Sequence, residues 1–161
     1  LVELASEAEL AALLGHEVTH AAARHSAQAL ERGIALQGAL IATSVALGDK
    51  SYAPYAVAGA GVAAALVNLR YGRDDEREAD AFGVKYTMAA GYDPRGLLTF
   101  FEKLKKLEGG RRQGGLDSMF SSHPATQERI DRIDRMIQKA GSPRGATRRE
   151  RFLEATASLR R

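Results

Sequence analysis

Residues 9–33, ELAALLGHEVTHAAARHSAQALERG, decide the fold of this chain. They form a long helix-favouring stretch, and they contain a motif whose two histidines lie on the same face only when the segment is helical. Within it, residues 16–20 read His-Glu-Val-Thr-His. At about 100° per residue, His16 and His20 lie about 40° apart on one helical face, so both imidazoles can bind one metal ion. Ser6 and Glu9 have the spacing of a capping box, which predicts the start of this helix.

Glu17 lies about 60° from His20 on the same helix, close enough to touch a metal-bound water rather than the metal. Neutral imidazoles suit Zn²⁺, and a catalytic zinc site keeps three protein ligands and one open position. We expect Glu17 to take a proton from the zinc-bound water as that water attacks a carbonyl. The alternative is a helix with two unrelated surface histidines; by chance the motif arises in roughly one such chain in a hundred.

A third ligand must come from elsewhere in the chain. A metzincin would place glycine and histidine where this sequence has Ala23 and Ser26, so that class is excluded. His25 is the nearest alternative. On a continuous helix it lies about 180° from His16 and about 140° from His20, so we expect it to point away from the metal, on the surface or behind the ligands.

The acidic segment DDEREAD, residues 74–80, offers better candidates. Glu76 and Asp80 share one helical face, where two like charges repel by a few tenths of a kcal/mol unless a cation lies beside them. One carboxylate can bind zinc while the other accepts a hydrogen bond from a ligand histidine. Glu78 is a rival ligand on charge alone, about 200° from both. The alternative for the whole segment is a solvated acidic helix start.

A fourth feature is SSHPATQER at residues 121–129. His123 precedes Pro124 at an expected helix start, from which a histidine can point into a cleft, and Arg129 lies one to two turns further along. Taken alone, the segment favours a capping histidine and an ordinary surface arginine.

Composition limits the remaining possibilities. The chain has 161 residues, of which 45% are hydrophobic and 27% charged, as expected of one globular domain. It has no cysteine, which excludes a disulfide scaffold, a thiolate zinc site and a cysteine nucleophile. Residues 144–161 hold six arginines and two glutamates, a balance of +4, against −1 for the rest. We do not expect nucleic-acid binding, because this basic tail offers only Phe152 as an aromatic platform.

The predicted fold class is mainly α. We expect helices over residues 9–33, 34–47, 55–90 with a break near Gly72, 97–108 and 125–140, and a short helix within 148–161. Turn residues separate these segments, as in GYDP at 91–94, and no alternating pattern indicates a strand.

The order of the motifs resembles a known family. HEVTHAAARH at 16–25, EREAD at 76–80, AAGYDP at 89–94 and SSHPATQERI at 121–130 are similar to the gluzincin metallopeptidases that include HtpX and the CAAX prenyl proteases. The closest likeness is to soluble, BepA-like members of the bacterial envelope. The resemblance implies a zincin-like peptidase domain over residues 1–141, followed by a basic linker and short helix at 142–161. The complete family domain is α+β, and we expect its upstream edge strands to be missing here.

The resemblance also implies roles for single residues. It makes Glu76 the third ligand of one zinc ion per chain and Asp80 the support of a ligand histidine. His123 and Arg129 fall on a histidine and an arginine that assist the transition state; in some envelope members, that histidine instead occupies the open zinc position and silences the enzyme. The implied function is a zinc metalloendopeptidase acting on unfolded or misassembled proteins in the bacterial cell envelope. The alternative is a silenced relative that works as a binding or chaperone-like module.

The resemblance also raises the question of membrane insertion, because HtpX-like members carry transmembrane helices between the two zinc motifs. Here residues 34–48 and 56–69 are two apolar stretches of about fifteen residues, too short for a comfortable span at about 1.5 Å per residue. Small residues such as Gly59 and Gly61 favour close helix packing. We expect a packed hairpin over 34–69, with contact to a membrane surface or a second protomer as its further use.

Overall fold

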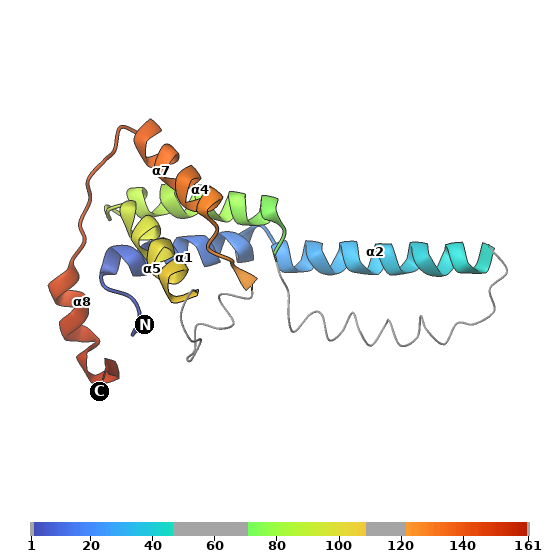
Figure 1. Ribbon diagram of the computed structural model, residues 1–161, viewed down its shortest axis with the longest axis horizontal. Helices are drawn as coiled ribbons and strands as arrows, with labels where there is room; N and C mark the ends of the chain where they lie inside the picture. The colour runs from blue at the N-terminus through green and yellow to red at the C-terminus, as the bar shows by residue number, and fades with distance from the viewer. Residues whose placement is uncertain (1, 47–70, 109–121, 161) are drawn as a thin grey trace.

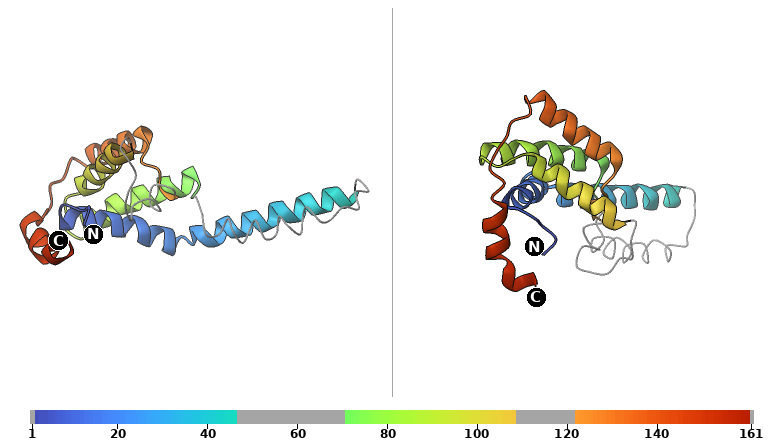
Figure 2. Two further views of the ribbon diagram at one scale, coloured as in Figure 1. Left: turned by 60° about the horizontal axis from the view of Figure 1, so that its bottom comes forward. Right: turned by 60° about the vertical axis from the view of Figure 1, so that its left-hand side comes forward.

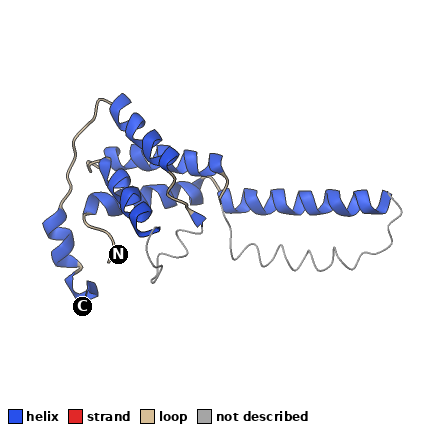
Figure 3. Ribbon diagram, viewed as in Figure 1, coloured by secondary structure: helices blue, strands red, loops and turns tan. Residues whose placement is uncertain are grey.

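The computed structural model describes residues 2–46, 71–108 and 122–160. Over these ranges the chain is helical, and the β-structure within them is a single bridge between Tyr92 and Ala146. The prediction of a mainly α fold is therefore confirmed (Figure 3). The helices are α1 (Glu7–Ala22), α2 (His25–Ala46), α4 (Arg73–Ala89), α5 (Arg95–Glu108), α7 (Gln127–Lys139), α8 (Arg149–Ala155) and a 3₁₀ helix (Ala157–Arg160).

Four helices, α1, α4, α5 and α7, pack around one core (Figure 1). α1 lies against both α4 and α5, and α7 closes the group by packing on α4 and α5. Burial of aliphatic and aromatic side chains between these helices is the main force that holds them together. The largest fully buried apolar side chains are those of Leu97, Phe100, Phe101, Leu104, Ile133 and Ile137.

α1 and α4 approach each other closely because both lack a side chain where they meet. A Cβ atom on Gly15 would lie 3.3 Å from the Cα of Gly83, and one on Gly83 would lie 3.3 Å from the backbone nitrogen of His16. Both distances are tighter than ordinary contacts in a packed interior. The glycine pair therefore brings the part of α1 that contains His16 directly against α4.

The start of α1 agrees with the sequence, but its end does not. The Ser6 hydroxyl accepts from the Glu9 N–H at 3.2 Å, while the Glu9 carboxylate accepts from the N–H of Ala5. α1 then ends at Ala22, and Arg24 takes a left-handed conformation with φ 57° before α2 begins. The predicted helices at 9–33 and 34–47 are thus wrong in their boundaries. This conformation costs roughly 1–2 kcal/mol, so the sequence alone gave no reason to expect it.

The other helix ends follow their capping residues. α4 begins directly after Gly72, where the predicted helix over 55–90 was expected to break, and the part of that helix before residue 71 lies outside the described residues. The chain leaves α4 through Gly91 at φ 79°. α7 begins at Gln127 with Thr126 as its cap, three residues after Pro124. The helix start expected at Pro124 is therefore placed too early.

The C-terminal segment lies against the N-terminal end of α1. The Phe152 side chain of α8 is buried in the core, and Arg160 donates to the backbone carbonyls of Val2 and Leu4. Backbone hydrogen bonds also join Ala146 to the turn after α4. The division into residues 1–141 and 142–161 stays a prediction.

α2 leaves the helix group as a long arm, at the end opposite α8 (Figures 1 and 2). Ile34 and Leu36 on this arm are more than half exposed. The second half of the predicted hairpin falls within residues 47–70, which lie outside the described residues, so the hairpin stays a prediction. Among the described helices, none is both long and apolar enough to cross a membrane.

Candidate metal centre

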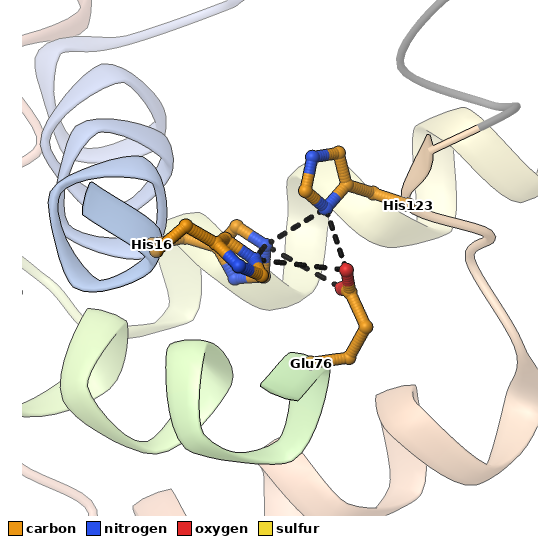
Figure 4. Close-up of side chains that lie close together, drawn as sticks. His16, Glu76 and His123 are labelled. Carbon is orange, nitrogen blue, oxygen red and sulfur yellow. Dashed lines mark hydrogen bonds and ion pairs between the residues drawn. The ribbon is translucent and has the colours of Figure 1, made fainter. Parts of the chain in front are cut away.

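Four buried side chains direct one donor atom each to a common point. They are His16 and His20 from α1, Glu76 from the first turn of α4, and His123 from the segment before α7. Their donor atoms all lie within 4.8 Å of one another. Figure 4 shows His16, Glu76 and His123 converging from three separate parts of the chain.

The spacings from Nε2 of His16 to the other three donor atoms fit a tetrahedral metal site, whereas Nδ1 of His123 lies 2.7 Å from Oε1 of Glu76, at hydrogen-bond distance. Two ligands about 2.05 Å from zinc at the tetrahedral angle are about 3.3–3.4 Å apart. The His16 Nε2 atom lies 3.2 Å from Nε2 of His20, 3.3 Å from Nδ1 of His123 and 3.5 Å from Oε2 of Glu76. Nε2 of His20 lies 3.6 Å from Oε1 of Glu76. Three imidazoles and one carboxylate are also the donor types that zinc prefers, so these residues fit the expected ion.

His20 on α1 is held in the form that binds metals. Burial, and then the neighbouring imidazoles of His16, His123 and His25, lower the pKa of His20 to about 3. The His20 ring is therefore neutral at physiological pH, with a lone pair available for a cation.

Asp80 lies behind His16, where its carboxylate can orient the ring. Oδ1 of Asp80 is 3.2 Å from Nδ1 of His16, and the Asp80 side chain is fully buried. Burial alone would raise the pKa of Asp80, but His16 and Arg129 hold it below its ordinary value. Asp80 thus stays ionised and can accept a hydrogen bond from the Nδ1–H of His16, which leaves Nε2 of His16 facing the other donor atoms.

Arg129 joins the acidic face of α4 to the segment that carries His123. Its guanidinium donates to both Asp80 oxygens, at 3.0 and 2.6 Å, and lies 2.7 Å from Oε2 of Glu76. It also donates to the Pro124 carbonyl at 3.1 Å and stacks over the Phe101 ring. The surface arginine that the isolated segment suggested is thus a buried one.

Glu17 lies beside the donor cluster without joining it. Its side chain is 42% exposed, and Oε1 lies 3.7 Å from Nε2 of His123. A carboxylate that is accessible to water and close to the cluster is suited to moving a proton.

His25 and Tyr71 both contact the ring of His20 without joining the four donor residues. Because the helix breaks at Arg24, His25 is 98% buried and its Nδ1 lies 2.9 Å from Nδ1 of His20. Of the two positions expected for His25, the structure has the one behind the candidate ligands rather than the one on the surface, and His25 stays outside the donor set. The Tyr71 ring stacks on His20 with centroids 3.9 Å apart, and no sequence signal marked this residue.

A cavity of about 500 Å³ lies beside the candidate metal ligands. Its lining includes Glu76 and Arg129, together with Tyr71, Pro124 and Arg132. It gives a molecule from solution access to the side of the centre that faces α7.

Comparison with known proteins gives a family for this arrangement. The model of peptidase family M48 matches residues 1–137. Metalloprotease YcaL of Escherichia coli is 35% identical over 133 residues, which cover 83% of this chain and 50% of the relative. Metalloprotease LoiP of the same organism is 34% identical over 137 residues, covering 84% and 52%. The beta-barrel assembly-enhancing protease of E. coli is 28% identical over 130 residues, covering 78% and 26%.

The chain spans about half the length of YcaL and LoiP. No solved structure shows a significant match to it. The matches confirm the resemblance that the order of the motifs indicated, including the likeness to the beta-barrel assembly-enhancing proteases. With nearly the whole helical core covered by the family model, this chain belongs to peptidase family M48.

Proposed function

We propose that this chain forms the zinc-binding core of a metalloendopeptidase. His16, His20 and Glu76 hold one zinc ion, and Glu17 acts as the base. The observation that carries the proposal is the set of donor atoms at tetrahedral spacing, with a separate carboxylate from Glu17 beside it. The relatives named metalloproteases support the reaction class.

When bound, zinc polarises the scissile carbonyl and brings the pKa of a water to roughly 7. The protein residues supply the rest of the chemistry. Glu17 is exposed enough to accept a proton from water and to pass it on to the leaving amine. Asp80 keeps the metal-facing nitrogen of His16 free of a proton, and Arg129 keeps Asp80 ionised.

His123 supports a second candidate function. Its Nδ1 atom lies 3.3 Å from Nε2 of His16, at the spacing of a fourth ligand, and 2.7 Å from Oε1 of Glu76, at hydrogen-bond distance. In that position His123 would fill the coordination site that a substrate needs, and the protein would be a silenced binding or chaperone-like module. If His123 instead lay off the metal, its imidazole could donate to a substrate oxygen, and Arg129 would hold its segment in place through the Pro124 carbonyl.

The substrates we propose are unfolded or misassembled proteins, and the location we propose is the bacterial cell envelope. Support comes from the similarity to the E. coli protease whose name describes enhanced β-barrel assembly. The cavity beside Glu76 is open enough to admit an extended segment rather than a folded domain.

The Glu17→Gln variant tests the mechanism. Because Glu17 is not among the ligands, the variant should bind one zinc ion per chain and cleave casein about 10²–10⁴ times more slowly. Metal analysis gives the first result and a casein assay, with and without chelator, gives the second. Glu102→Gln, an exposed change on α5, is the matched control and should leave both unchanged. An unchanged cleavage rate in Glu17→Gln refutes the mechanism.

The His123→Ala variant separates the two candidate functions. If His123 caps the metal, its removal increases casein cleavage while zinc stays bound by the other three ligands. If His123 assists the reaction, its removal decreases cleavage. A parent chain that binds zinc, fails to cleave casein and is activated by this change supports the silenced form.

A further inference from the structure

A chain of two side chains lies behind His20, on the side away from the metal centre. Nδ1 of His25 is 2.9 Å from Nδ1 of His20, and Nε2 of His25 is 3.3 Å from Oε2 of Glu78. His25 is 98% buried, whereas the Glu78 side chain is half exposed. The three residues therefore form a line from solvent to the metal-binding face of His20.

The protonation of this line follows from its geometry. Nε2 of His20 faces His16 and Glu76, so a metal bound there needs the lone pair on that atom. A neutral His20 must then carry its proton on Nδ1 and donate it to Nδ1 of His25. His25 accepts through Nδ1, so its own proton is on Nε2, where it faces the Glu78 carboxylate.

The line also explains the use of Glu78, which was a rival ligand on charge alone. On α4, Glu76 points to the metal centre, Asp80 lies behind His16, and Glu78 ends the line behind His20. Each histidine of the motif thus has its own carboxylate from α4, one directly and one through His25. The break at Arg24 makes this possible, because it turns His25 back toward the preceding helix.

We propose that His25, backed by Glu78, is a positioning residue that fixes the tautomer and orientation of His20 for metal binding. The proposal rests on the proposed zinc site. Removal of such an outer partner typically weakens metal binding about 10–100-fold. Glu78 contributes less than His25, because water can replace a half-exposed carboxylate at 3.3 Å.

The test measures zinc affinity of the 161-residue chain by competition with a chelator. His25→Phe keeps a buried ring but removes the acceptor, and it should weaken zinc binding about 10–100-fold. His25→Asn restores an acceptor for the Nδ1 proton of His20, and it should recover at least half of that loss on a logarithmic scale. Glu78→Gln should weaken binding less than tenfold. Asp74→Asn, a 93% exposed change on the same helix, is the control and should have no effect.

Two further measurements separate positioning from a merely structural role. Thermal unfolding of the metal-free variants shows whether His25→Phe folds, and the shift that zinc adds to the melting temperature should be smaller than in the parent chain. Ring ¹⁵N shifts of His20 in the parent, zinc-bound chain should report a proton on Nδ1. If His25→Phe does not fold, Glu78→Gln tests the same line of residues, because its change is at a half-exposed position.

The outcomes distinguish the two proposals. Unchanged zinc affinity in both His25→Phe and Glu78→Gln, with zinc bound normally by the parent chain, overturns the positioning role and leaves the zinc site intact. A loss in His25→Phe that His25→Asn does not recover also overturns it, since the ring would then matter only for packing. A parent chain that binds no zinc overturns both proposals.

Discussion

Replacing Arg129 with methionine tests whether a single buried guanidinium holds the metal-free centre together. In the folded protein the Arg129 side chain is 6% exposed, and it contacts the carboxylates of Asp80 and Glu76, which are equally buried or more so. Arg129→Met keeps most of the side chain that lies over the Phe101 ring but removes the charge. Asp80 keeps a second partner, because Arg132 donates to it at 2.6 Å, whereas Glu76 loses its guanidinium contact.

The expected loss follows from these contacts. Removing one partner of a buried ion pair costs about 3–5 kcal/mol, because the remaining charge is left uncompensated in the interior. At an m-value of about 2 kcal/mol/M, the urea midpoint of the metal-free protein should fall by about 1.5–2.5 M. The urea midpoint of Arg129→Lys should lie between those of the parent and Arg129→Met. An ammonium keeps the charge but cannot donate to both oxygens of Asp80 in parallel.

The assay is urea unfolding in the presence of chelator, followed by circular dichroism. A double-mutant cycle with Asp80→Asn supplies the control. The double variant should lose about 1–3 kcal/mol less free energy of unfolding than the sum of the losses in the two single variants. If Arg129→Met unfolds within about 1 kcal/mol of the parent, or the two losses simply add, the guanidinium is not what compensates these carboxylates.

Two further predictions concern packing and pH. Gly96→Ala should lower the free energy of unfolding by at least about 2 kcal/mol, because its Cβ would lie 2.4 Å from the backbone oxygen of Ala8. The matched change Gly33→Ala on α2, with nothing within 4 Å, should raise it by about 0.5–1 kcal/mol; equal melting temperatures for the two variants would contradict this packing. Burial and neighbouring imidazoles lower the folded pKa of His20 to about 3, so the unfolded chain binds more protons below about pH 6.5. Metal-free protein should therefore lose on the order of a few kcal/mol between about pH 6.5 and 3, with a shallower loss in His20→Gln; parallel urea-unfolding profiles would refute it.

The features that were predictable from sequence share a local cause. His16, His20 and Glu17 are fixed relative to one another by helical periodicity, and Glu76 and Asp80 by the same rule on a second helix. Once both segments form helices, the positions of these groups follow from their spacing. The helix ends at Ser6 and Gly72 were also local, because capping residues act over three or four positions.

The features that were missed depend on contacts between distant segments. Nothing in the run AAARHSAQ marks Arg24 as left-handed, because alanine and arginine are good helix formers and the break is stabilised by His25 meeting His20 and Glu78. The burial of Arg129 also depends on contacts between distant segments. Its guanidinium, six residues after His123, becomes buried only because α7 packs on α4. Helical periodicity gives the direction of each side chain around its own helix, but it does not give the neighbouring helix that the side chain will contact.

The contact between Gly15 and Gly83 has a consequence for how this centre can change during evolution. His16 follows directly after the first glycine, and Asp80, which supports His16, lies three residues before the second. The distance between the α1 and α4 sides of the candidate centre therefore depends on two positions that lack a Cβ atom. A single methyl group there acts as a spacer between the helices and shifts one half of the centre against the other. At the proposed zinc site, a side chain at either glycine should therefore change metal affinity through the separation of α1 and α4, although neither position carries a ligand.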